Sequence, residues 1–266
     1  MSRRASLVAV IMCLSGTALC ANGAVFTLAD GNATAVVDAA GAGMCDWTVD
    51  GVDQLGRQWF WLRLADIGPE SNVSTLPYIG GLTDTNFDGF AETLYLCYTS
   101  PQVMIELTFI LRGGAAGSGT SDIIESIAIS NISSSPLTTH FFQYVDLNLN
   151  NSVINKSLVI TGGNTATQAM DSCRVAETVV TPRPSHYQAG TAPLTQAALE
   201  DALPTTLSDT TGPTGPDDLA WAFQWDALIA AGGKLIISKD KQVIPEPCTM
   251  ILLTVGAVAT LLRKRR

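Results

Sequence analysis

Apolar and polar residues alternate with a period of two along much of this chain, which is the pattern of β-strands that bury one face. In the clearest segment, Val103, Ile105, Leu107, Phe109 and Leu111 fall on one side. Turns rich in Gly, Pro, Asn, Asp and Ser separate such segments. The other predicted strands lie at 25–38, which holds two, and at 44–49, 57–64, 93–98, 121–131, 139–149, 156–161, 166–171, 173–180, 218–226 and 234–239.

One of these strands has two apolar faces. In residues 57–64, Phe60 and Leu62 lie on one side and Trp59 and Trp61 on the other. A strand of this kind is typical of the middle of a sheet that is covered on both sides.

Two long strands, 121–131 and 139–149, are joined by a turn rich in Ser and Pro. They either form an antiparallel pair or cross from one sheet to another. The one helix predicted within the body is Ala192–Leu203, ended by Pro204. We therefore predict an all-β fold, a large two-sheet antiparallel sandwich over residues 24–240 with one short helix.

The N-terminal 23 residues have the layout of a secretory signal peptide. Arg3 and Arg4 precede an apolar segment at 7–19, and Ala21-Asn22-Gly23 is a candidate cleavage site. We expect signal peptidase to remove this segment, which makes the protein an exported one.

The C-terminal residues predict a single hydrophobic helix. Cys248–Leu262 contains fifteen uncharged residues, which would span about 22 Å against a hydrocarbon core of about 30 Å. Arg263–Arg266 supply four cations that favour the cytoplasmic side. The segment is therefore a short membrane span, better suited to a transient anchor than to a permanent one.

Residues 244–266 resemble the PEP-CTERM sorting signal of exported bacterial proteins. The resemblance is carried by a recognition motif, an apolar helix and a basic end, here Pro245, Glu246, Pro247, Arg263, Lys264, Arg265 and Arg266. It implies an exosortase-like enzyme as a partner, cutting near the motif, and a destination in the cell envelope or extracellular matrix. Cys248 replaces the Ser or Ala more usual in such tails, which leaves the cut site open.

The body carries a second resemblance. It resembles sandwich domains found ahead of such tails. The resemblance is carried by a long strand, the turn Asn131–Leu137 and a second long strand that contains Gln143-Tyr144-Val145-Asp146. In outline they also resemble the supersandwich of mutarotase-like proteins. No catalytic residue is carried over from either resemblance.

The charge of the body disfavours nucleic acid as a partner. Residues 24–243 contain 9 Lys and Arg against 23 Asp and Glu, a net charge of about −14, whereas phosphates require a cationic face. Cys45, Cys97 and Cys173 form an odd set, so their disulfide pairing stays open. No CxxC spacing predicts zinc.

The strongest motif of the body is a candidate calcium loop. Asp84, Asn86 and Asp88 place oxygen ligands at alternate positions, and Gly89 allows a sharp turn. Tyr95 occupies the twelfth position, where a calcium loop has a bidentate acid. The alternative is a polar turn in which these side chains cap their own backbone.

Signals for catalysis are weak. His140 and His186 are the only histidines, and no G-x-S-x-G motif supplies a nucleophile for a triad. We therefore expect neither to be catalytic. Carboxylates that could pair for glycoside hydrolysis stand on apolar or aromatic strands, at Glu106, Glu125, Asp146 and Asp226.

Tryptophans offer a further possibility for sugar binding. Trp59, Trp61, Trp221 and Trp225 could form a stacking platform for a sugar, or lie in the core. Together these patterns predict a non-enzymatic, exported surface or matrix protein with no certain cofactor. The alternatives are a carbohydrate- or calcium-dependent exopolysaccharide-binding module and a secreted glycan-active enzyme.

Overall fold

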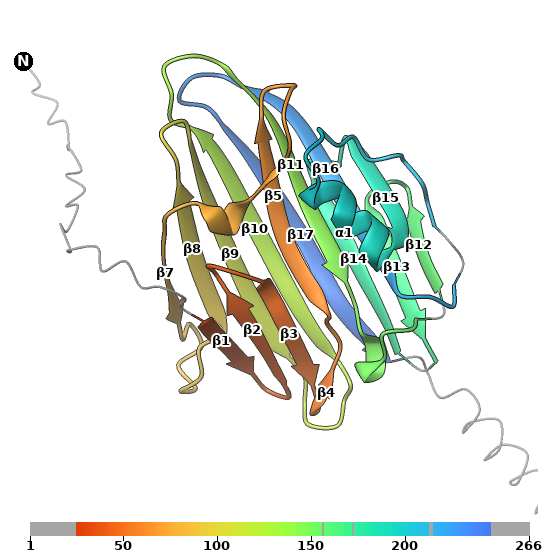
Figure 1. Ribbon diagram of the computed structural model, residues 1–266. Coiled ribbons are helices and arrows are strands. Elements are labelled where there is room, and N and C mark those ends of the chain that lie inside the picture. Colours follow the sequence, from red (N-terminus) through yellow and green to blue (C-terminus); the bar gives the residue numbers. More distant parts are fainter. Residues whose placement is uncertain (1–24, 156, 172, 213–214, 246–266) are drawn as a thin grey trace, which may run out of the picture.

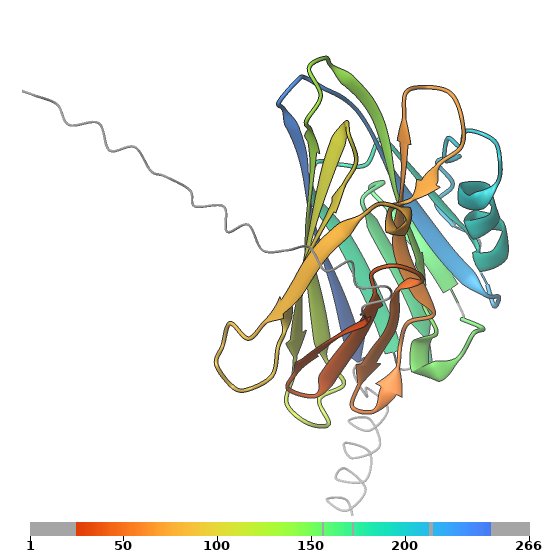
Figure 2. The same ribbon diagram turned by 60° about the vertical axis from the view of Figure 1, so that its left-hand side comes forward.

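Two antiparallel β-sheets pack face to face in the computed structural model, which describes residues 25–155, 157–171, 173–212 and 215–245. Figures 1 and 2 show the two layers and helix α1 (Ala192–Glu200) on the outside of one of them. The predicted two-sheet sandwich is confirmed. The expected signal peptide, the hydrophobic C-terminal helix and most of the sorting motif lie outside the described residues. No helix in the described part of the chain is long and apolar enough to cross a membrane.

Sheet A has nine strands and follows the order β1-β2-β3-β5-β11-β16-β15, with β4 beside β3 and β6 beside β5. Its strands are β1 (Val25–Asp30), β2 (Ala33–Asp38), β3 (Gly43–Val49), β4 (Val52–Asp53), β5 (Arg57–Leu64), β6 (Ser71–Asn72), β11 (Leu137–Asp146), β15 (His186–Thr191) and β16 (Leu219–Ile229).

Sheet B has eight strands in the order β12-β13-β14-β17-β10-β9-β8-β7. They are β7 (Tyr78–Thr83), β8 (Thr93–Thr99), β9 (Val103–Gly113), β10 (Ser121–Asn131), β12 (Ser157–Thr161), β13 (Thr165–Met170), β14 (Cys173–Thr181) and β17 (Lys234–Pro245). The 3₁₀ turns η1 (Val73–Thr75) and η2 (Leu149–Asn151) and the helix α1 (Ala192–Glu200) complete the described elements.

The core lies between the sheets and is rich in aromatic side chains. Phe60 of β5 stacks on Phe141 of β11 with ring centres 5.5 Å apart and contacts Phe109 of β9 across the interface. Residues 58–62 of β5 are all buried, which confirms the prediction of a central strand. Because β10 lies in sheet B and β11 in sheet A, the Ser- and Pro-rich turn is a crossover between sheets.

Four charged side chains are buried in the same interior. Glu125 of β10, Glu177 of β14 and Lys239 and Lys241 of β17 are each at most 1% exposed. Lys239 Nζ lies 2.5 Å from Glu125, and Lys241 Nζ lies 3.1 Å from Glu177. Gln58 of β5 donates to Glu125 at 2.8 Å, so the group is neutral and connects both sheets.

Four described strands lie outside the predicted ones, and the helix ends earlier than predicted. The unpredicted strands are β4 and β6, of two residues each, β7, which contains two glycines, and β15, which is polar and has only Ala189 buried. Helix α1 ends at Glu200 rather than Leu203. The reason is local, because Asp201 is extended and its carboxylate accepts a bond of 2.7 Å from Leu203 N.

Candidate functional site

A row of polar side chains lies on the outer face of sheet A. Because Phe141 points into the core and side chains alternate along a strand, His140 points to the opposite face. The register of the strands sets His140 beside Arg63 of β5 on one side and Asp226 of β16 on the other. It also sets Gln224 of β16 beside His186 of β15.

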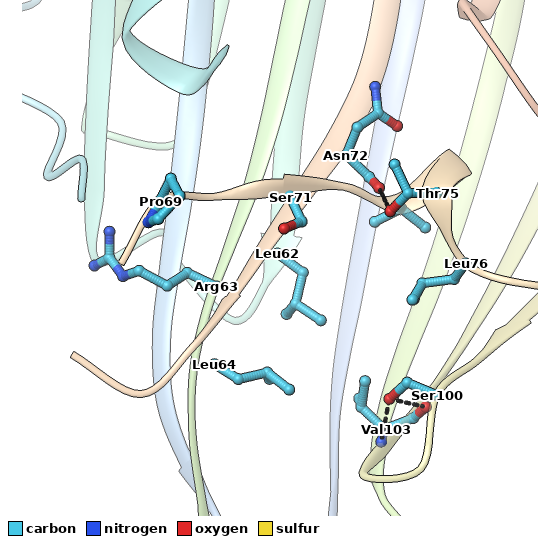
Figure 3. Close-up of a pocket in the computed structure, with 11 residues that line it drawn as sticks. Leu62, Arg63, Leu64, Pro69, Ser71, Asn72, Thr75, Leu76, Ser100 and Val103 are labelled. Atoms are coloured by element: carbon cyan, nitrogen blue, oxygen red, sulfur yellow. Dashed lines mark hydrogen bonds between the residues drawn. The ribbon is translucent and has the colours of Figure 1, made fainter. Parts of the chain in front are cut away.

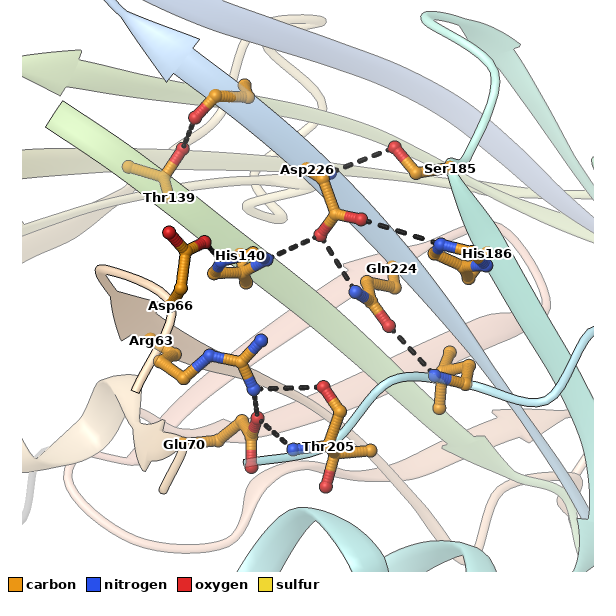
Figure 4. A network of polar contacts seen from close by, with 12 residues as sticks. Arg63, Asp66, Glu70, Thr139, His140, Ser185, His186, Thr205, Gln224 and Asp226 are labelled. Atoms are coloured by element: carbon orange, nitrogen blue, oxygen red, sulfur yellow. Dashed lines mark hydrogen bonds and ion pairs between the residues drawn. The ribbon is translucent and has the colours of Figure 1, made fainter. Parts of the chain in front are cut away.

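Asp226 lies between the two histidines (Figure 4). Its Oδ1 is 2.7 Å from His140 Nδ1, and its Oδ2 is 3.7 Å from His186 Nε2. The second nitrogen of each ring faces another carboxylate: Asp66 lies 3.2 Å from His140 Nε2, and Asp209 lies 3.0 Å from His186 Nδ1. Two imidazoles thus alternate with three carboxylates across one sheet face.

The central carboxylate is held by its neighbours. Gln224 Nε2 donates to Asp226 Oδ1 at 2.7 Å, while its Oε1 accepts from Leu207 N at 2.9 Å. The backbone N of Asp226 donates to Ser185 Oγ at 2.9 Å. Side chains held in this way lose little freedom when a ligand binds, which favours a defined geometry.

The site is accessible, and access varies along the row. The side chain of His140 is 12% exposed, those of His186 and Asp226 are 32% and 31% exposed, and that of Asp66 is 81% exposed. A ligand hydroxyl could therefore replace Asp66 beside His140 without disturbing the strands.

This arrangement is suited to proton transfer. An imidazole can accept or donate a proton near neutral pH, and a carboxylate on one ring nitrogen fixes which nitrogen carries the hydrogen. Two such rings on either side of one carboxylate can supply an acid and a base to the same substrate. The described part of the chain contains no group of three or more His, Cys, Asp or Glu side chains placed to hold a metal ion.

The candidate calcium loop is occupied by its own backbone. Asp84 accepts bonds from Phe87 N at 2.6 Å and Gly89 N at 2.9 Å. Asn86 accepts from Asp88 N at 3.0 Å, and Asp88 accepts from Phe90 N at 2.9 Å. The structure thus has the polar turn named above as the alternative, and calcium binding stays a hypothesis.

The possibility that four tryptophans form a stacking platform for a sugar is wrong. Trp59, Trp61, Trp221 and Trp225 are each at most 2% exposed, so no sugar ring can stack on them.

Of the four carboxylates considered for glycoside hydrolysis, only Asp226 lies in the histidine row. Glu125 belongs to the buried charged group, and Glu106 binds Tyr95 Oη at 2.9 Å. Burial and the charge of Asp218 raise the pKa of Asp146 to about 7.

The sorting motif is described only at its first residue. Pro245 ends β17 opposite Cys173, so the last strand runs past the predicted boundary at residue 240. Glu246, Pro247, Arg263, Lys264, Arg265 and Arg266 lie outside the described residues. Cys45, Cys97 and Cys173 are free thiols, the first exposed and the other two buried.

A separate cavity of about 290 Å³ lies beside the C-terminal end of β5. Figure 3 shows Leu62, Leu64 and Leu76 around it, together with Ser71 and Ser100. None of the histidines or their carboxylate partners lines this cavity.

Comparison with known proteins identifies the fold but not the family. No family model and no curated protein sequence matches the chain. A galactose mutarotase related enzyme from Lactobacillus acidophilus has a similar structure, with a TM-score of 0.51 and 6% identity over 83% of this chain and 97% of that one. The GalM/aldose epimerase homologue from C. elegans has a TM-score of 0.51 and 8% identity over 85% of this chain and 100% of that one.

A larger protein contains the same fold. A bacterial glucoamylase complexed with acarbose has a TM-score of 0.53 and 9% identity over 89% of this chain. This chain spans only 36% of the glucoamylase. At these identities the likeness is one of fold alone.

These neighbours overturn the expectation of a non-enzymatic surface or matrix protein. Their fold, which this chain shares, is one that carbohydrate-active enzymes use. The expectation rested on the lack of a local catalytic motif. The polar row contains no such motif, because strand register brings together residues that are distant in the sequence, such as His140 and Asp226, 86 positions apart.

Proposed function

We propose that the protein is a carbohydrate-active enzyme of the aldose-epimerase kind, which interconverts the anomers of a sugar at the outer face of sheet A. The observation that carries this proposal is the sharing of one carboxylate, Asp226, by two imidazoles, His140 and His186, on the outer face of sheet A. The fold shared with an aldose epimerase homologue supports it.

The chemistry needs one acid and one base. A base removes the proton of the anomeric hydroxyl while an acid protonates the ring oxygen, and the bond between the anomeric carbon and that oxygen breaks. The open-chain aldehyde turns its carbonyl and closes on the other face, which returns both protons. No oxidant, reductant or metal enters this balance. His140 and His186 can exchange the two roles with the direction of the reaction.

Each residue of the row has a distinct task. Asp226 fixes the ring of His140 through Nδ1 and leaves Nε2 for the substrate, once a hydroxyl replaces the exposed Asp66. Asp209 holds the ring of His186 through Nδ1, while Asp226 Oδ2 lies 3.7 Å from its Nε2. Gln224 holds Asp226 and adds an amide donor that lowers the freedom of its carboxylate.

The test is the rate at which a freshly dissolved pure anomer reaches its equilibrium rotation. We expect the protein to accelerate this rate for at least one sugar in a panel of neutral hexoses and pentoses. Asp226→Asn should lower the acceleration by about 10²-fold or more, in the range attributed to acid–base groups. The matched control is Asp46→Asn, since Asp46 accepts a bond from Thr48 and lies on β3, which β5 separates from the strands of the row. A panel that equilibrates at the uncatalysed rate with the folded protein present would refute the proposal.

We further propose that the domain acts after export and that its tail is processed at the Pro-Glu-Pro motif. The charged start and apolar segment at residues 1–23 and the motif, apolar run and Arg-rich cluster at 244–266 support this. The partners would be signal peptidase and an exosortase-like enzyme, with the membrane as a transient anchor. Mass spectrometry of exported protein should find a C-terminus near Pro247. Exported protein that still carries Arg263–Arg266 would contradict it.

A further inference from the structure

Of the three carboxylates that face the two histidines, one lies on a strand and two lie on loops. Asp226 stands within β16 and is fixed by the sheet. Asp66 lies in the loop after β5, and Asp209 lies in the segment between α1 and β16. The residues next to them bond to neighbouring strands, Ala65 N to Thr138 O and Ala189 N to Thr210 O, each at 3.0 Å. The rest of each loop is held by side-chain contacts.

A buried ion pair joins the two loops. Arg63, the cross-strand neighbour of His140, binds Glu70. The two residues are 5% and 7% exposed. Glu70 Oε1 also accepts from Thr205 N at 2.8 Å, and Arg63 Nη1 donates to Thr205 O at 2.9 Å. The guanidinium lies over the ring of Phe142, 5.8 Å from its centre. Figure 4 shows Arg63, Glu70 and Thr205 together beside the histidine row.

Contacts lead from this ion pair to both imidazoles. On one side, Glu70 closes the loop that carries Asp66 to His140. On the other side, the segment pinned at Thr205 continues to Leu207, whose N–H holds Gln224, and then to Asp209.

The segment is held at two more points before it reaches His186. Ser208 Oγ donates to Gln188 at 3.0 Å, and Asp209 accepts from Tyr187 N at 3.2 Å as well as facing His186. One ion pair therefore anchors both loops that complete the row.

We propose that Arg63 and Glu70 are positioning residues for the site: their buried pair sets where Asp66 and Asp209 lie against His140 and His186. Its kinetic consequence rests on the proposed function. Its structural consequence does not, because the environment of the imidazoles can be observed without a substrate.

The chain is well suited to this test because it contains only two histidines, both in the row. Imidazole ¹H–¹⁵N spectra therefore report on this site alone. In Arg63→Met/Glu70→Leu both charges are removed, so no unpaired ion is left buried. Glu70→Gln is a milder variant that keeps an acceptor for Thr205 N. The matched control is Arg57→Met/Glu200→Leu, which removes another ion pair of the same face, 3.2 Å long and more exposed.

We expect the imidazole signals of both histidines to move in Arg63→Met/Glu70→Leu, and less in Glu70→Gln, with no change in the control. If the wild type accelerates anomer exchange, kcat should fall by about 10²-fold, as expected when reacting groups are misplaced by about 1 Å. Unchanged imidazole signals in both Glu70 variants would overturn the positioning role. If the signals move while the wild type shows no exchange of anomers, the positioning role stands and the proposed function fails.

Discussion

Replacing Lys239 by Met should destabilise the protein strongly, because it removes one charge from a buried group of four. Lys239, Lys241, Glu125 and Glu177 are each at most 1% exposed and carry two positive and two negative charges. Burial raises the pKa of Glu125, but Lys239 and Lys241 outweigh it and hold that pKa below its usual value. Burial also lowers the pKa of Lys239, against the charges of Glu125 and Glu177; the 2.5 Å contact of Lys239 with Glu125 favours the charged form of both. Without Lys239 the interior keeps one uncompensated negative charge.

The expected loss of stability in Lys239→Met follows from this uncompensated charge. Breaking a buried ion pair by removing one partner costs about 3–5 kcal/mol. For a domain of this size, 1 kcal/mol corresponds to about 2–4 °C in Tm, so Tm should fall by roughly 6–20 °C. Glu125→Gln/Lys239→Met keeps an acceptor for Gln58 and leaves the pair of Glu177 and Lys241. The double variant should therefore be more stable than Lys239→Met alone.

Urea unfolding at pH 7 measures these differences. Glu125 has a folded-state pKa below its unfolded value of about 4.3. The stability that it contributes is therefore present above about pH 4.3 and lost as pH falls through the folded-state pKa. Lys234→Met, at an exposed position of the same strand, is the control and should cost less than about 0.5 kcal/mol. A loss from Lys239→Met no larger than that of the control would refute the reasoning.

Three further predictions concern other parts of the molecule. The folded-state pKa of Asp146, about 7, exceeds an unfolded value of about 3.9. The stability that Asp146 contributes to the folded state is therefore fully present below about pH 4 and lost as pH rises through 7. Asp146→Asn should therefore be more stable than the wild type by about 2–4 kcal/mol at pH 8, with the difference shrinking toward pH 4, and a less stable variant at pH 8 would contradict this. Millimolar Ca²⁺ should leave Tm unchanged, because the oxygens of the Asp84 turn accept backbone N–H bonds; a rise in Tm that Asp88→Ala abolishes would show otherwise. Tryptophan emission should lie at short wavelength and resist acrylamide, since Trp47, Trp59, Trp61, Trp221 and Trp225 are all at most 2% exposed, and strong quenching would conflict with the core described above.

The sheets could be predicted because a strand that buries one face has apolar and polar residues in alternation along its sequence. Val103 to Leu111 alternate in the sequence because β9 buries one side against sheet A, and residues 57–64 lack alternation because β5 is covered on both. Strand β15 has no such alternation. It lies at the edge of sheet A, and its stability comes from pairing with β16 rather than from apolar side chains.

The site could be predicted only in part. The alternation of 139–149 and the inward Trp221 and Trp225 already place His140 and Asp226 on outward positions of their strands. Register decides that these two positions are opposite one another, and no local pattern encodes it. His186 lies outside every predicted strand, because β15 has no apolar alternation. At the Asp84 turn a local motif is present but ambiguous. Oxygens at alternate positions can bind a cation or accept hydrogen bonds from the backbone of the turn equally well.

Exchange NMR of an equilibrated sugar tests most directly whether His140, Asp226 and His186 carry out acid–base chemistry on a sugar. The rate at which magnetisation passes between the anomeric signals of the two forms reports turnover without a coupled assay. With wild-type protein present, we predict faster exchange for at least one neutral aldose, lost in Asp226→Asn and retained in Asp46→Asn. Exchange at the uncatalysed rate across the panel, with both imidazole signals showing a folded site, would contradict the account.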